Sequence, residues 1–243
     1  RHEALRTAFA VVDSEPVQRI FAAIPLNFAV EDLSSLPAQA RTARIMAGAN
    51  QLAEMPFDLT TPPLFRARLM LVDSSESVFL FVIHHIIADG WSLEVLFRDL
   101  TTLYTQELTA QPATLNPLPL QYVDYSVWQR TQYQSADLQA QLDFWRHTLA
   151  DLPVLDLPVD HARPAFQQFR GGQVELLIDQ STTAALRDLA NAEDATLFML
   201  LLAAFYVLLN RYSRQDDLVV GTPIANRRHS ELEDVVGFFV NTL

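Results

Sequence analysis

The segment that most constrains the fold is an unbroken apolar run, Val78 to Ile83, which follows a polar turn at residues 73–76. Successive side chains of a β-strand point to opposite faces, so a strand of this composition needs a covering layer on each side. Downstream, from Trp91 to Leu108, apolar residues recur every three or four positions, which is the period of a helix. Ser92 or Asp89 is expected to cap its start. Together the two segments predict layers of sheet and helix.

Further elements are predicted along the chain from the same two periods. Four segments have the short apolar pattern of strands: Val17–Ala23, Arg66–Val72, Gln173–Ile178 and Leu218–Thr222. Four segments have the composition or period of helices: Ser34–Glu54, Tyr122–Leu149, Thr182–Glu193 and Thr196–Arg211. Because their order lacks regular βαβ spacing, the chain is predicted to be an α/β protein of the α+β sandwich type, not a doubly wound sheet.

Prolines divide the chain near its middle. Pro153, Pro158 and Pro164 interrupt regular structure, since proline fixes φ and lacks an N–H donor. This stretch predicts a crossing between two lobes, residues 1–165 and residues 166–243. Both ends of the sequence look like positions inside a longer polypeptide, so the second lobe is expected to be incomplete.

Composition excludes several classes of protein. Of the 243 residues, 50% are hydrophobic and none is Cys, which argues against disorder, disulfides, a thiolate nucleophile and Cys-ligated metal sites. A formal net charge of −12 disfavours contact with nucleic acid or anionic membranes. The longest apolar run, Leu197 to Leu209, is shorter than the roughly 20 residues that span a bilayer. A cytoplasmic location is expected, with no signal peptide.

One loop concentrates unusual chemistry: His84-His85-Ile86-Ile87-Ala88-Asp89-Gly90, between the buried strand and the helix. Adjacent strand side chains point to opposite faces, so the two histidines are poorly placed to chelate one metal; one should face a cavity and the other the core. A histidine of near-neutral pKa can act as a general base. Gly90 permits close backbone approach or positive φ. On spacing alone, a catalytic and a structural histidine remain equal alternatives.

The motif resembles the HHxxxDG signature of the condensation domain of nonribosomal peptide synthetases, a chloramphenicol acetyltransferase-like superfamily. Other stretches resemble that family in the same order: Arg1–Phe9, Tyr122–Trp128, Leu152–Pro158 with Asp160 and Arg163-Pro164, Gly221–Arg227, and Gly237–Leu243. HHxxxDG alone is shared with other acyltransferases, but the resemblance extends over the whole chain.

The resemblance implies acetyltransferase-like lobes in a V-shaped pair, with the second lobe truncated. It implies amide formation between a donor aminoacyl or peptidyl thioester and the amine of an acceptor aminoacyl thioester, in the biosynthesis of secondary metabolites such as antibiotics. Both substrates would be held on the phosphopantetheine arms of upstream and downstream peptidyl carrier proteins, beside an adenylation domain of the same synthetase. No directly bound cofactor and no metal are expected. The thioester is already activated, and alignment supplies much of the acceleration.

The resemblance also assigns roles to residues. His85 is the expected catalytic residue, either deprotonating the amine or the tetrahedral intermediate, or positioning the amine. His84, Asp89 and Gly90 are expected to support it, and Asp89 is expected to pair with Arg227 or, as second choice, Arg163. Three side chains are candidates for lining the channel: Arg6, Trp91 and Asn241. Gly237 and Asn241 are expected in a loop that bridges the lobes.

Other functions stay open at this point. A heterocyclising relative would have aspartates in place of His84 and His85, whereas an epimerising relative would keep the histidines; Gly90-Trp91-Ser92 favours ordinary condensation. A catalytically silent domain that recruits partner enzymes is a second class, which loss of His85 or Asp89 would favour. A stand-alone acyltransferase that uses coenzyme A thioesters is a third.

Overall fold

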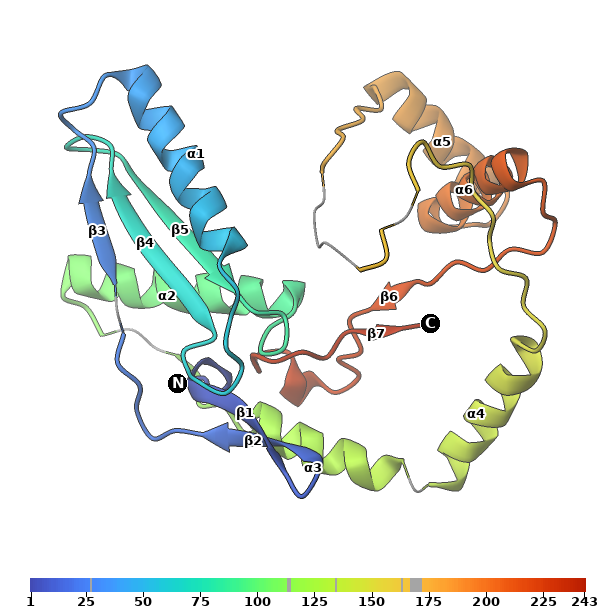
Figure 1. The fold of residues 1–243 in the computed structure, drawn as a ribbon, viewed down its shortest axis with the longest axis horizontal. Coiled ribbons are helices and arrows are strands. Elements are labelled where there is room, and N and C mark those ends of the chain that lie inside the picture. Colours follow the sequence, from blue (N-terminus) through green and yellow to red (C-terminus); the bar gives the residue numbers. More distant parts are fainter. Residues whose placement is uncertain (27, 113–114, 134, 163, 167–171) are drawn as a thin grey trace. The chain divides into compact units, whose positions relative to one another are not determined.

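The computed structural model describes residues 1–26, 28–112, 115–133, 135–162, 164–166 and 172–243. The chain forms two compact units (Figure 1), one of residues 1–140 with 222–243 and one of residues 141–221. The sequence predicted a boundary near residue 165. The segment 222–243 instead belongs to the first unit, because its residues bond to side chains of residues 89 and 92 there.

A three-stranded sheet organises the first unit (Figure 1), in the order β3 (Ala29–Asp32), β4 (Phe65–Leu71) and β5 (Ser77–Ile83). Strand β3 is parallel to β4, and β4 is antiparallel to β5. The predicted cover on both faces is present. Helix α1 (Ala38–Glu54) packs on the face that carries Leu80, so closely that a Cβ added at Gly48 would lie 3.4 Å from the Leu80 side chain. Helix α2 (Gly90–Thr109) packs on the opposite face, where its Phe97 ring contacts the ring of Phe81.

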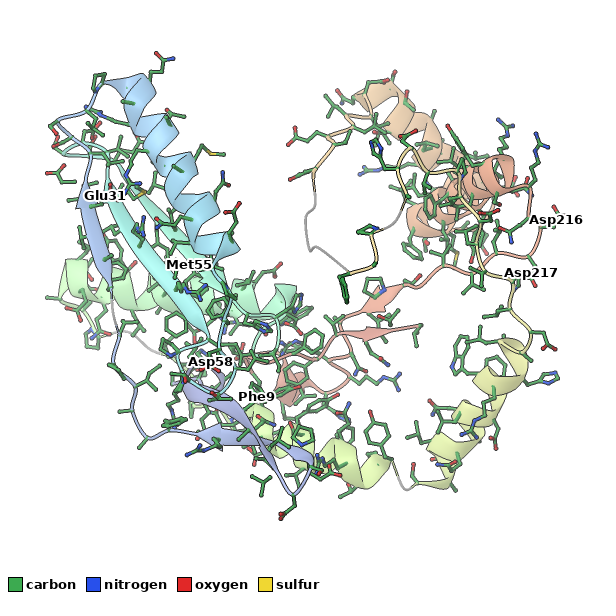
Figure 2. All side chains as sticks on the ribbon, in the orientation of Figure 1. Phe9, Glu31, Met55, Asp58, Asp216 and Asp217 are labelled. Carbon is green, nitrogen blue, oxygen red and sulfur yellow. The ribbon has the colours of Figure 1, made fainter. Side chains whose placement is uncertain are left out.

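A hairpin precedes the sheet. It follows the short helix η1 (Glu3–Arg6) and consists of β1 (Thr7–Val12) and β2 (Glu15–Ile20), paired antiparallel. Figure 2 shows Phe9 next to Asp58, and the N–H of Phe9 donates to the carbonyl of Leu59 at 2.7 Å. This hydrogen bond ties the hairpin to the loop that leads into β4.

The remaining elements of the first unit are helix α3 (Tyr122–Gln132), η2 (Ser230–Leu232) and the two-residue strands β6 (Pro223–Ile224) and β7 (Asn241–Thr242). Helix α4 (Ala136–Thr148) runs on into the second unit. The structure has two clusters of buried apolar residues, and the first includes Ile87 and Ala88 of the loop after β5. One contains Ala4, Leu64, Ile87, Ala88, Val95 and Val236, and the other contains Tyr125, Leu232, Val235 and Phe239.

The second unit contains helices α5 (Gln180–Ala192) and α6 (Leu197–Ser213). Asp179 caps α5 by accepting from the N–H of Thr182 at 2.8 Å, and after α6 the carboxylate of Asp216, labelled in Figure 2, accepts from Asn210 at 3.0 Å. Within the described residues, no single helix is long and apolar enough to cross a bilayer; α5 and α6 reach that length and composition only together, as a pair bent by 103°.

Three predicted elements were wrong. The helix predicted over Tyr122–Leu149 is two helices, because Ser135 starts a new one: its hydroxyl accepts from the N–H of Leu138 at 3.3 Å. Residues 173–178 form no strand; Leu177 is 94% exposed, and no partner strand lies beside them in the described parts of the chain. At the predicted strand Leu218–Thr222, pairing begins only at Thr222, whose N–H donates to Leu243. Strands β1 and β3 were not predicted.

Candidate active site around His85

The loop after β5 is shaped by His84. The backbone N–H of His84 donates to the carbonyl of Leu64 at 2.9 Å and so continues the pairing of β5 with the chain before β4. Its ring nitrogen Nδ1 accepts from the N–H of Ile86 at 3.0 Å, and its carbonyl accepts from the N–H of Ile87 at 3.1 Å. The chain therefore turns sharply and buries Ile87 and Ala88.

The two histidines lie in different surroundings. His84 is half-buried, with its ring edge-on to Phe57 at 5.7 Å between centroids. Burial, and secondarily the neighbouring His85, lower the pKa of His84. Because its Nδ1 accepts a hydrogen bond, the neutral ring carries its proton on Nε2. His85 is exposed, and its ring contacts Phe238 at a centroid distance of 5.0 Å and an interplanar angle of 77°.

Asp89 is 2% exposed and accepts four hydrogen bonds. Its Oδ1 accepts from the N–H of Ser92 at 2.8 Å, from the Ser92 hydroxyl at 2.7 Å and from Nη2 of Arg227 at 3.1 Å. Its Oδ2 accepts from the N–H of Phe239 at 3.0 Å. Burial by itself raises the pKa of Asp89, but these hydrogen bonds and the Arg227 charge hold the pKa below its usual value. The residue is also the N-cap of α2.

Arg227 completes the expected ion pair, with both side chains at most 1% exposed. Its Nη1 donates to the carbonyls of Leu232 and Val235, and its guanidinium lies 4.0 Å from the centroid of Phe239. Its Nε is buried without a partner among the described residues. Burial lowers the pKa of Arg227, and Asp89 opposes that shift. The second-choice partner, Arg163, lies outside the described residues.

The hydroxyl of Ser92 joins two distant segments. It lies 2.9 Å from Nη2 of Arg227, accepts from the N–H of Gly237 at 3.1 Å, and lies 2.8 Å from the carbonyl of Gly237. Ser92 is fully buried. The sequence suggested only a capping role for it. Its spacing, three residues after Asp89, indicates the helix cap but not the contact with Gly237.

The contact between Tyr122 and Gly237 was not predicted; the sequence placed Gly237 only in an expected loop that bridges the lobes. A Cβ added at Gly237 would lie 2.1 Å from the Tyr122 ring, so only glycine fits beneath that ring. The Tyr122 hydroxyl donates to the carbonyl of Phe238 at 2.8 Å. Burial raises the pKa of Tyr122 to about 12, so the hydroxyl keeps its proton and remains a donor at neutral pH.

The other predicted site residues have simpler surroundings. Arg6 donates to Glu3 at 3.0 Å and to the carbonyl of Phe21. Trp91 is 42% exposed and donates from Nε1 to the carbonyl of Glu233 at 2.9 Å, and Asn241 is exposed in β7. The reason given for Gly90 was wrong: its φ is not positive, and an added Cβ would meet nothing within 4 Å.

A second buried carboxylate fastens the start of the chain. Asp99 on α2 lies 2.9 Å from Nε2 of His2, 2.6 Å from Arg1 and 3.2 Å from Arg98. Burial lowers the pKa of His2, although Asp99 opposes that shift. These contacts fasten Arg1 and His2, the first two residues of the motif at residues 1–9, to α2.

The two surface hollows lie away from His85, and no metal site is found among the described residues. Two surface hollows of about 360 and 320 Å³ lie at the end of α2 and beside β4, and His85 lines neither. No group of three or more His, Asp or Glu side chains in the described ranges could hold a metal ion.

Comparison with known proteins identifies the family. The model of the family described as Condensation domain matches residues 1–243. The chain belongs to the condensation-domain family. The resemblance predicted from the motifs is thereby confirmed. Condensation domains of peptide synthetases form amide bonds, which is an acyltransferase-type reaction.

The curated relatives of this condensation-domain chain are much longer than the chain. All of the chain matches chondramide synthase cmdD of Chondromyces crocatus at 44% identity over 243 residues, which is 6% of that protein. All of it matches malpibaldin synthetase of Mortierella alpina at 42% identity over 245 residues, which is 4% of that protein. The chain thus spans a small part of each relative.

Solved condensation-type structures share the fold. The X-domain from teicoplanin biosynthesis matches with a TM-score of 0.87 and 32% identity, over 100% of this chain and 54% of that one. A four-domain nonribosomal peptide synthetase, holo-AB3403 bound to AMP and glycine, matches with a TM-score of 0.83 and 32% identity, over 100% of this chain and 18% of that one. The predicted mixed α/β fold class is confirmed.

Proposed function

We propose that this chain is part of a condensation domain that joins two carrier-bound substrates by an amide bond. The donor is an aminoacyl or peptidyl thioester and the acceptor is an aminoacyl thioester, each on the phosphopantetheine arm of a peptidyl carrier protein. The acceptor nitrogen attacks the donor carbonyl carbon, the carbon–sulfur bond breaks, and the departing sulfur takes up a proton as a thiol. The amide nitrogen loses one proton in the same sequence.

The observation that carries this proposal is the contrast between His85 and Asp89. His85 is exposed in the turn that follows β5, while Asp89, four residues on, is buried and holds the loop through four hydrogen bonds. A rigid loop that presents one free imidazole is what proton transfer at a fixed place requires. We assign His85 to handling the amine proton, either by removing it or by positioning the amine.

The chain also lacks the groups of covalent acyl transfer that would compete with this reading. It contains no Cys and no G-x-S-x-G sequence. Direct attack of the amine on an activated thioester needs no nucleophile from the protein. Alignment of amine and thioester and exclusion of water then supply a large part of the acceleration.

The wider architecture is part of the proposal. The two acetyltransferase-like lobes would form a V, the two carriers would dock at opposite mouths of a channel that passes His85, and the synthetase would be cytoplasmic with an adjacent adenylation domain. Trp91 and Asn241 have exposed side chains and are proposed to line that channel. Arg6 is assigned a structural role because its guanidinium already bonds Glu3 and Phe21.

Recruitment of a partner enzyme is the second candidate function. It is favoured by the likeness to the X-domain, which has also been solved in a complex with OxyB from teicoplanin biosynthesis. Retention of both His85 and Asp89 favours condensation over recruitment.

The test uses the complete synthetase module that contains this chain, with both carriers loaded. Mass spectrometry of the downstream carrier should detect the joined product, and omission of either loaded carrier should abolish it. Equal product from a donor supplied as a coenzyme A thioester would instead indicate a stand-alone acyltransferase. A module that forms no product but retains a bound partner enzyme would indicate recruitment.

A further inference from the structure

The His85 imidazole has few contacts. Among the described residues, no hydrogen bond or ion pair to its imidazole is found, and the ring contact it makes is with Phe238, at 5.0 Å and 77°. An exposed side chain of this kind samples several rotamers unless a neighbour selects one. The edge-on contact is an energetically preferred arrangement of two aromatic rings.

Phe238 differs from the phenylalanine that follows it. Phe239 is 2% exposed and belongs to a buried cluster with Tyr125 and Val235. Phe238 is 39% exposed and belongs to neither buried cluster. Burial of apolar surface therefore explains why a phenylalanine stands at position 239, but it explains little of why one stands at position 238.

The backbone around Phe238 is nonetheless fixed at three consecutive residues. The N–H and carbonyl of Gly237 both contact the buried hydroxyl of Ser92. The carbonyl of Phe238 accepts from the Tyr122 hydroxyl at 2.8 Å, and the N–H of Phe239 donates to Asp89 at 3.0 Å. The Phe238 ring thus projects from a segment that has little freedom to move.

The chain segments that carry the two rings are joined by the same carboxylate. Asp89 ends the loop that carries His85, and it also binds the residue next to Phe238. We propose that Phe238 is a positioning residue, which acts on the reaction by fixing the orientation of the His85 imidazole. Asp89 then serves catalysis by setting the distance between two chain segments. This inference rests on the proposed function.

A double-mutant cycle in the complete module tests it. Phe238→Leu should lower kcat about fivefold, within the roughly two- to twelvefold change in rotamer population that the energy of an aromatic pair corresponds to. KM for each loaded carrier should stay within about twofold, and Phe238→Tyr, which keeps a ring, should restore kcat. In a His85→Ala background, Phe238→Leu should change the residual rate less than about twofold, because the residue through which it acts is gone.

The neighbouring residue provides a matched control. Phe239→Leu removes a buried ring, so it should lower the melting temperature, whereas Phe238→Leu should leave it nearly unchanged. If Phe238→Leu fails to fold, the same cycle is run with Tyr122→Phe, which removes only the hydroxyl that holds the Phe238 carbonyl and should lower kcat in the same direction.

The outcomes separate this inference from the proposed function. Wild-type kcat in Phe238→Leu, or an equal loss with and without His85, would overturn the positioning role alone. A wild-type rate in His85→Ala would overturn the proposed function, and the positioning role with it.

Discussion

The carboxylate of Asp89 lies 3.0 Å from the backbone nitrogen of Phe239, a residue 150 positions further along the chain. This hydrogen bond joins the histidine loop to the segment 237–239. The same carboxylate caps α2 and pairs with Arg227. The buried carboxylate of Asp89 therefore joins three parts of the first unit: the histidine loop, the start of α2 and the segment 227–239.

Replacing Asp89 with Asn should destabilise the protein by about 3–5 kcal/mol, because it leaves Arg227 charged and buried without its partner. Activity should fall together with the melting temperature, which calorimetry measures. Arg44→Gln is the matched control: it breaks an ion pair with Glu31 whose side chains are 41% and 29% exposed, so about 1 kcal/mol or less is expected. An Asp89→Asn variant of full stability but no activity would assign the carboxylate to the chemistry instead.

Two glycines should respond oppositely to alanine. Gly237→Ala places a methyl group 2.1 Å from the Tyr122 ring and should destabilise by about 1–3 kcal/mol. Gly90→Ala points into open space at the first residue of α2 and should leave the melting temperature equal or slightly higher, since alanine favours helix. Equal melting temperatures for both variants would show that Tyr122 does not constrain Gly237.

His84 should matter through its Nδ1 acceptor. His84→Leu leaves the N–H of Ile86 without its partner and should destabilise by about 1–3 kcal/mol. His84→Asn supplies an oxygen near the position of Nδ1 and should recover part of that loss. Thermal unfolding of the two variants decides the matter, and an Asn variant no more stable than the Leu variant would contradict this role.

Acid should destabilise the fold below pH about 6.5. The pKa values of His2 and His84 are both lowered, chiefly by burial, so the unfolded chain binds their protons more readily than the folded chain. The stability that these neutral histidines contribute is complete above the ordinary histidine pKa of 6.5 and is lost as pH falls through their folded pKa values. Melting temperatures should therefore decline from pH 7.5 to pH 5.

A second loss should follow at lower pH. Asp89 and Asp99 have pKa values below the ordinary 3.8, so their contribution to stability is present above that value and disappears as pH falls further.

The control for the first decline, between pH 7.5 and pH 5, is the double variant His84→Asn with His2→Gln, which should flatten that decline. A wild-type melting temperature that stays constant from pH 7.5 to pH 5 would contradict a stabilising role of neutral His2 and His84.

The sequence predicted contacts that follow from charge and local pattern. A carboxylate in an apolar loop requires a cation, and Arg227 was the first candidate named. Strand β5, with its cover on both faces, followed from composition alone. Helices α2, α5 and α6 were predicted to within two residues, because their caps are short polar side chains at the start of apolar periods.

Other features depend on contacts between distant residues. The role of Ser92 requires Gly237 to lie beside it, 145 positions away, and nothing local indicates this. The break between α3 and α4 was missed because residues 129–135 contain no proline or glycine that would mark the end of a helix. The strand predicted at Gln173–Ile178 has the right alternation, but a strand also needs a neighbour for its hydrogen bonds, and a pattern within one segment does not reveal whether that neighbour is present.

The central claim is that His85 handles the proton of the attacking amine. The most direct test is the single-turnover rate of amide formation by His85→Ala in the complete module, with saturating loaded carriers and the melting temperature measured in parallel. We predict a rate at least about 10²-fold below wild type, as expected for loss of a general base, with an unchanged melting temperature because the side chain is exposed. A folded His85→Ala module that forms the amide at the wild-type rate would contradict the account.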